Sequence, residues 1–205
     1  MKEKKYVIIF VVIILILMIF MFNQQREKQM YKKYISNQLA SNIQTLILTI
    51  DENQRTYTEV ISNNLITPQQ SKTLMHNNEI IRDIINKTRE LAIATKKRKD
   101  GYQYNESSAN AGMLTRLYYI WHEEVFKTDT KLDEEMKNQI EKSSELNEVW
   151  IKVTHKDTSK NYKLNQSAWL ILLDELETKT VEFLHNNDMN GIEEIWKTRP
   201  EKKDQ

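Results

Sequence analysis

A run of 17 apolar residues near the N-terminus constrains this chain more than any other feature. Residues 6–22 read YVIIFVVIILILMIFMF, without a charge, a glycine or a proline. In lipid every backbone N–H and C=O must be paired within the segment, and a single helix does this. Such a helix is about 25 Å long, slightly less than the hydrocarbon core of a bilayer, and residues 23–25 can continue it. We predict a transmembrane helix over residues 6–23.

Two alternatives exist for this segment. A buried core helix of this length would normally carry a polar face. A cleaved signal peptide fits the basic tail of residues 1–5, which contains Lys2, Lys4 and Lys5. However, no small-x-small cleavage pattern follows, and the first alanine is Ala40. An uncleaved signal-anchor is therefore the preferred interpretation.

Orientation follows less directly, because basic residues flank the apolar run on both sides. The N-terminal tail has three lysines, and residues 26–33 contain four Lys or Arg. A short basic tail stays in the cytoplasm easily, whereas long domains translocate largely regardless of charge. We expect a single-pass protein of the cell membrane with a cytoplasmic N-terminus and an extracytoplasmic domain.

The rest of the chain favours an all-α fold. Three glycines and two prolines among 205 residues are too few for the many tight turns of a β-sandwich or barrel. We predict a soluble bundle of about five helices over residues 24–198 and a loose polar tail over 199–205. The absence of cysteine excludes disulfides, thiolate metal sites and a Cys nucleophile. A net charge of +1 gives no general attraction to nucleic acid.

The first helix of the bundle is marked by apolar residues at steps of three and four, with one larger gap. No Gly or Pro interrupts residues 24–66. A helix unbroken from residue 6 would approach ~90 Å, so we expect a kink or break. The residues of the apolar face are Tyr31, Ile35, Leu39, Ile43, Leu46, Ile50, Tyr57, Val60 and Ile61.

The second helix has the clearest start, because Thr67, Pro68 and Gln70 form a capping box with proline in the first turn. It is expected to end near residue 97, where the basic run 96–99 complements the helix dipole. The apolar segment 168–173 is too short to cross a bilayer and is predicted to be the most buried core helix. Further helices are expected over residues 110–127, from a capping pattern that begins at Thr130 and includes Asp133 to the polar loop 155–163, over 165–185, and over 188–196.

Glu182 and His185 are the best candidates for a metal site, and they are weak ones. The Glu-x-x-His spacing places two ligands on one helix face, but the site needs a second such pair, and the sequence has none. His122 lacks the second histidine, four residues on, of a zinc-protease helix. We therefore assign no catalytic residue, no metal and no cofactor.

Two other features have structural interpretations. The basic run 96–99, followed by Tyr102 and Tyr104, has the composition of a phosphate-binding or base-stacking site. A helix end with a solvated loop is the preferred interpretation, and no nucleic acid is expected as a partner. The four tryptophans lie on separate predicted helices, which favours core packing over a ligand pocket. They are Trp121, Trp150, Trp169 and Trp196.

Three classes of function remain. The preferred one is a non-catalytic binding or interaction module for a protein or cell-envelope partner, tethered to the bilayer through residues 6–23. The second is structural, with residues 31–61 pairing with a second copy as a coiled coil. The third is an enzyme of unrecognised type that uses carboxylates and His in an inter-helix cleft. The third requires Glu182 and His185 to point inward and to meet another carboxylate.

Overall fold

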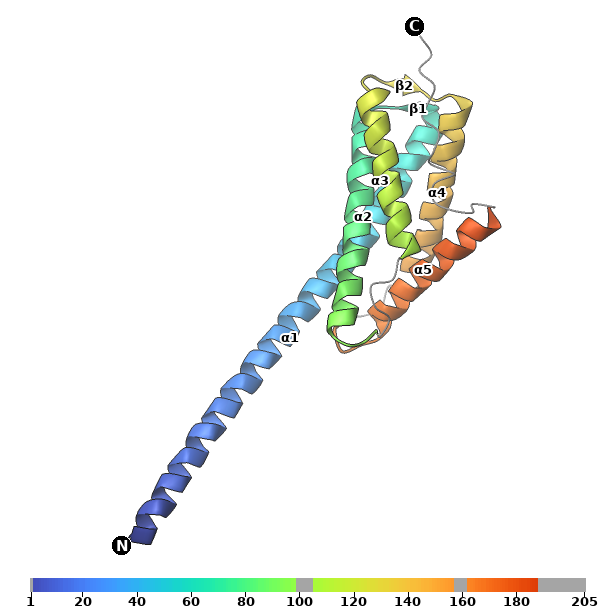
Figure 1. Ribbon diagram of the computed structural model, residues 1–205. Coiled ribbons are helices and arrows are strands. Elements are labelled where there is room, and N and C mark those ends of the chain that lie inside the picture. Colours follow the sequence, from blue (N-terminus) through green and yellow to red (C-terminus); the bar gives the residue numbers. More distant parts are fainter. Residues whose placement is uncertain (1, 99–104, 157–161, 188–205) are drawn as a thin grey trace.

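The computed structural model describes residues 2–98, 105–156 and 162–187, with side chains from residue 10 onward (Figure 1). In this part of the chain there are five helices and one two-stranded ribbon, which confirms the predicted all-α helical bundle. The helices are α1 (Lys2–Asn63), α2 (Pro68–Ala94), α3 (Glu106–Glu124), α4 (Glu134–Thr154) and α5 (Ala168–Asn186). The strands are β1 (Leu65–Ile66) and β2 (Thr130–Lys131).

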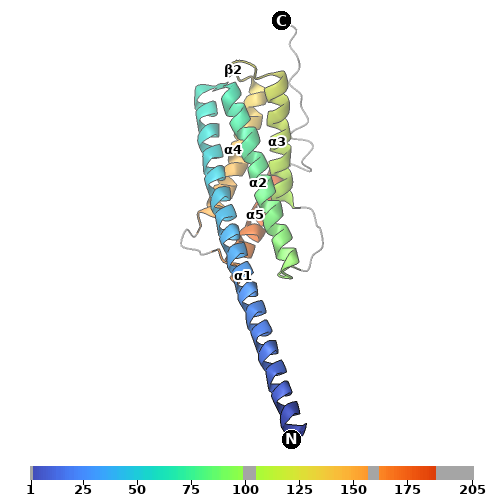
Figure 2. The same cartoon turned by 90° about the vertical axis from the view of Figure 1, so that its left-hand side faces the viewer.

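Helix α1 is continuous over 62 residues, so the expected break is wrong. Kinks need a cause such as proline, glycine or an inserted side chain, and α1 contains neither Gly nor Pro. Its N-terminal half stands free of the bundle (Figures 1 and 2). It is long and apolar enough to cross a membrane, and none of its most apolar window is buried in the protein. Among the described side chains of α1, Leu39 is the first that is buried.

The second half of α1 packs against α2 and α4, and α2 also packs against α3. Helix α5 lies obliquely across α4 and contacts α3, at the end of the bundle from which α1 leaves (Figure 1). The ribbon closes the opposite end, with Leu65 paired to Lys131 and Ile66 to Thr130. Its two strands join the α1–α2 connection to the α3–α4 connection, which fixes these two helix pairs to each other.

The helix boundaries confirm one predicted cap and correct another. Gln70 N–H donates to Thr67 Oγ1 at 3.1 Å and Thr67 N–H donates to Gln70 Oε1 at 3.0 Å, which is the predicted capping box. Helix α4, in contrast, begins after Asp133, whose Oδ1 accepts from Met136 N–H at 2.9 Å. Thr130 does not start this helix, because its backbone pairs with β1.

Two further boundaries differ from expectation for local reasons. Helix α2 ends at Ala94 because Lys96 adopts a left-handed backbone with φ of 55°, so the basic run follows the helix rather than forming its last turn. Helix α3 begins earlier than predicted, because Asn105 caps it through Ser108 N–H. Glu177 of α5 also accepts from the first backbone N–H groups of α3, at 3.1 Å from Glu106 and 3.4 Å from Ser107.

The core has two apolar clusters, one near the ribbon and one near α5. Fully buried polar residues separate them on three helices: Asn53 on α1, Asn78 on α2 and Ser143 on α4. Each falls in sequence between the last residue of one cluster and the first of the other. We call these three residues the polar layer. Asn53 occupies the larger gap in the apolar pattern of the first helix.

Residues 168–173 do not form the most buried helix, contrary to the prediction. Trp169, Leu172 and Leu173 are buried, but Ile171 is 44% exposed. The reason is position, because α5 lies on the outside of α3 and α4 and buries only one face. The predicted short helix over 188–196 and the tail over 199–205 lie outside the described residues.

Candidate partner-binding groove

The weak metal candidates lie on the exposed face of α5. Glu182 and His185 are both exposed, and Glu182 forms an ion pair with Lys179. No third carboxylate or histidine joins them, and the described residues contain no group of three or more potential metal ligands. The inward convergence that a carboxylate–His site requires is therefore not met at this pair.

Two of the other histidines, His122 and His155, have structural surroundings. His122 is half-buried beside Trp121, and its neighbour Glu123 pairs with Lys127 at 3.1 Å. His155 at the end of α4 contacts Asp51 of α1 at 3.0 Å, a pair that sequence spacing could not reveal. In the described parts of the chain, no hydroxyl group forms a hydrogen bond with His155. Its effect is to join α1 to α4.

The described residues of the basic run lie in solvent or form an ion pair, and the described tryptophans lie in the core. Lys96 and Lys97 are exposed, while Arg98 reaches across to Asp174 of α5 at 2.8 Å. Residues 99–104, which include both tyrosines of the proposed stacking site, lie outside the described residues. Three tryptophans are fully buried, at positions 121, 150 and 169, and Trp196 lies outside the described residues.

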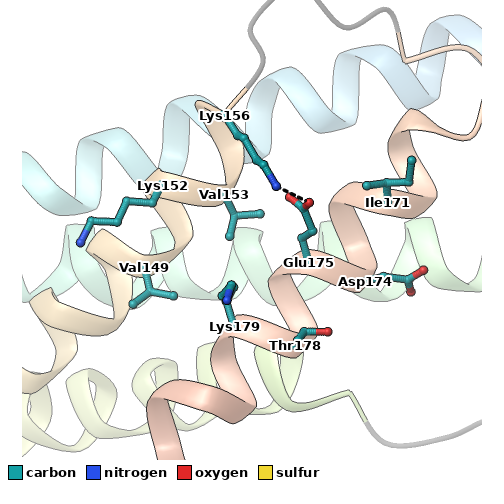
Figure 3. Close-up of a pocket in the computed structure, with 9 residues that line it drawn as sticks. All are labelled: Val149, Lys152, Val153, Lys156, Ile171, Asp174, Glu175, Thr178 and Lys179. Atoms are coloured by element: carbon teal, nitrogen blue, oxygen red, sulfur yellow. Dashed lines mark hydrogen bonds and ion pairs between the residues drawn. The ribbon is translucent and has the colours of Figure 1, made fainter. Parts of the chain in front are cut away.

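A concave surface in the described structure is a groove between α4 and α5, with a volume of about 510 Å³ (Figure 3). We call it the α4–α5 groove. It exists because α5 crosses α4 obliquely, so the two helices meet at Trp150 and Thr180 and leave space beside that contact. Its lining residues are Val149, Lys152, Val153, Lys156, Ile171, Asp174, Glu175, Thr178 and Lys179.

The groove is lined by both apolar and charged side chains. Val149 and Val153 come from α4, and Ile171 comes from α5. Lys156 and Glu175 form an ion pair at 2.7 Å that bridges the two helices (Figure 3). The lining is net basic, and Lys152 has no ion pair or hydrogen bond to a described side chain. This arrangement can bind an apolar side chain that has an acidic neighbour.

The polar layer is a second unusual feature, but its three residues are fully buried and offer no surface to a ligand. Neither Nδ2 nor Oδ1 of Asn53 has a hydrogen-bond partner, and the hydroxyls of Tyr57 and Tyr118 lack one of ordinary geometry. Burial raises the pKa of Tyr57 to about 12, although Asn78, Tyr118 and Ser143 partly oppose this. Burial also raises the pKa of Tyr118 well above its usual value. Both tyrosines are therefore neutral, and the layer offers dipoles rather than charge.

Sequence reasoning missed the α4–α5 groove because the groove depends on the angle at which α5 crosses α4, which side-chain spacing along one helix does not give. The signal that was available is Ile171, an apolar residue whose position on α5 is shared with Asp174 and Thr178 rather than with the buried Leu172 and Leu176. Comparisons of the chain with protein-family models, with curated proteins and with solved structures found no match.

Proposed function

We propose that this protein is a membrane-anchored, non-catalytic binding module that holds a partner protein in the α4–α5 groove. The single observation that carries the proposal is the groove itself, an open apolar depression on an otherwise charged bundle. Specific ligand sites commonly combine an apolar floor with a few placed polar groups in a volume of about 300–1,000 Å³. The free N-terminal half of α1 supplies the anchor, because its apolar side chains are exposed.

The occupant that fits best is an amphipathic helix of the partner, with an apolar face and an acidic flank. Helices bind grooves through anchors spaced three or four residues apart. Val149 and Val153 on one side and Ile171 on the other provide the apolar contact. Lys152, which has no ion pair with a described side chain, attracts a carboxylate, and this contact sets orientation more than affinity.

Two exposed residues of α5 allow a matched test. Ile171 in the groove is 44% exposed, and Val181 outside it is 46% exposed. A photoreactive residue at Thr178 of the full-length chain is expected to give one discrete adduct in native membranes. Ile171→Asp should abolish that adduct, because it replaces an apolar lining residue with a charge, whereas Val181→Asp should leave it. Equal adducts from both variants, or none from the parent chain, contradict the groove as the partner site.

The proposal includes an extracytoplasmic bundle, which follows from the expected orientation of the anchor. The chain has no cysteine, so one introduced thiol reports location unambiguously. Tyr119→Cys places a thiol on α3 at a side chain that is 55% exposed. A membrane-impermeant maleimide should label it in intact cells. Labelling only after lysis would place the bundle in the cytoplasm.

A further inference from the structure

The outward face of α1 is uncharged over an unusual length. Residues 34–50 contain no charged side chain. In a chain that is 29% charged, 17 residues would ordinarily hold about five charges. The inner face of this stretch needs none, because it is buried against α2 and α4. The outer face is exposed, and the other helices of the bundle carry charged residues on their exposed faces.

Six exposed residues on this outer face follow one another at alternating steps of four and three. We call them the outer stripe, and they are Met30, Tyr34, Asn37, Ser41, Gln44 and Leu48. This is the 3.5-residue period of a two-helix coiled coil. The two ends of the stripe carry large side chains, with Tyr34 68% exposed and Leu48 55% exposed. Its centre carries small or amide side chains that allow close approach.

The absence of charge identifies the kind of partner. When two identical helices pair in parallel and in register, each residue faces its own copy, so any charge meets a like charge and destabilises the pair. A different protein would instead be bound more selectively through complementary charges. A stripe that is uncharged on a charged bundle therefore suits a second copy of this chain. Asn37 at the centre of such a pair fixes register, as single buried asparagines do in coiled coils.

The continuity of α1 determines how the copies meet. One unbroken helix runs from the exposed apolar segment through the outer stripe and into the bundle. Two chains anchored in the same bilayer present their α1 helices parallel and at the same height. This confinement raises the effective concentration, so a stripe with few large apolar groups is sufficient. This step rests on the membrane anchoring in the proposed function.

We infer that two copies of this chain pair in parallel along the outer stripe of α1. This pairing surface differs from the apolar face that the spacing of residues 31–61 indicates. The inner face from Leu39 to Val60 is filled by α2 and α4 of the same chain and is not available to a partner. The pairing surface is the opposite face of the same helix, extended toward the N-terminus by Met30 and Tyr34.

Single cysteines in the otherwise cysteine-free chain test the pairing. Leu48→Cys lies on the outer stripe, and Tyr119→Cys lies on α3, outside that stripe. The two parent side chains are both 55% exposed, so they form a matched pair. After mild oxidation of membranes that contain the full-length chain, Leu48→Cys should give roughly tenfold more disulfide-linked dimer, because pairing raises the local thiol concentration. Equal yields from the two variants overturn the inference.

A charge swap at Gln44 makes the test specific for self-pairing. Gln44→Lys or Gln44→Glu, each added to Leu48→Cys, should lower the dimer yield, because like charges then face each other. Co-expression of the two charged chains should restore it as a mixed dimer. Gln44 is exposed, so circular dichroism should show an unchanged bundle. Dimer yields that do not depend on the charge at position 44 overturn the inference.

Alkaline extraction of the same samples separates the two proposals. Chains that stay in the membrane without a Leu48 dimer overturn the pairing and leave the anchored module standing. Chains that are extracted yet still form the Leu48 dimer overturn the anchoring and support the pairing. Extraction together with a lack of dimer overturns both.

Discussion

At the scale of single residues, the core tolerates an unpaired amide. Asn53 is fully buried, and neither polar atom of its side chain has a partner. Asn147 of α4 is also buried, but its Nδ2 donates to Ile50 O at 3.0 Å and to Gln54 Oε1 at 2.9 Å. Burying an unpaired amide costs about 1–3 kcal/mol, whereas a made hydrogen bond contributes about 1 kcal/mol. The two asparagines therefore have opposite effects on stability.

Asn53→Leu is expected to stabilise the bundle by about 1 kcal/mol, because it removes an unpaired amide from an apolar position. Asn147→Leu, the matched control, is expected to destabilise by about 1 kcal/mol because it removes two hydrogen bonds. Urea unfolding followed by circular dichroism measures both changes. A loss of stability in Asn53→Leu would show that the amide is paired, for example through an internal water.

The pH dependence of stability contains a contribution from Glu106, the first residue of α3. Burial, and then the nearby carboxylate of Glu177, raises the pKa of Glu106 above its ordinary value. The folded state therefore binds this proton more tightly than the unfolded state, so the ionised carboxylate destabilises the fold at neutral pH. That destabilisation disappears as the pH falls below the ordinary pKa of a glutamate.

Glu106→Gln should therefore be more stable than the parent chain at pH 7, and the difference should vanish below about pH 4. Thermal unfolding across this pH range measures it. Glu134→Gln at the exposed start of α4 is the control, since it only removes a charge that favours the helix dipole. A difference that persists unchanged at acidic pH would refute ionisation of Glu106 as the cause.

At the scale of elements, helix starts differ in how they are stabilised. Thr67 caps α2 through a complete capping box, whereas Ser167 precedes α5 without a side-chain cap bond. Thr67→Ala should lower the free energy of unfolding by about 1 kcal/mol, within a range of about 0.5–2 kcal/mol for lost caps. Ser167→Ala should change it by less than about 0.5 kcal/mol. Equal effects in chemical denaturation would contradict the assigned cap.

At the scale of the whole molecule, membrane anchoring and folding of the bundle can be tested separately, because the N-terminal half of α1 stands free of the bundle. None of the described side chains from residue 10 to residue 34 is buried, so changes in the apolar segment should not affect the bundle. Replacing Ile13 and Ile14 with lysine makes insertion less favourable by about 5–7 kcal/mol. The variant should be released by alkaline carbonate, while the matched double alanine variant stays in the membrane pellet. Release of the parent chain would refute the anchor.

Much of the architecture was accessible from sequence because it depends on local periodicity. The capping box at Thr67 and Gln70 and the apolar face from Leu39 to Val60 are confirmed, since both depend on residues three or four apart. The start of α4 was misplaced, because the pairing of Thr130 with Ile66 involves a strand 64 residues away. The groove was not predictable because it depends on the angle between α4 and α5.

The amino-acid sequence by itself determined the all-α class, the apolar segment and the inner face of the first helix, because these follow from backbone pairing and from side-chain spacing along a single helix. Tertiary structure alone decided which faces stay free. The oblique crossing of α5 opens the α4–α5 groove, and the packing of α2 and α4 on α1 leaves the outer stripe exposed. Spacing marks an apolar face, but only the arrangement of neighbours shows whether that face, or the one opposite, is available to a partner.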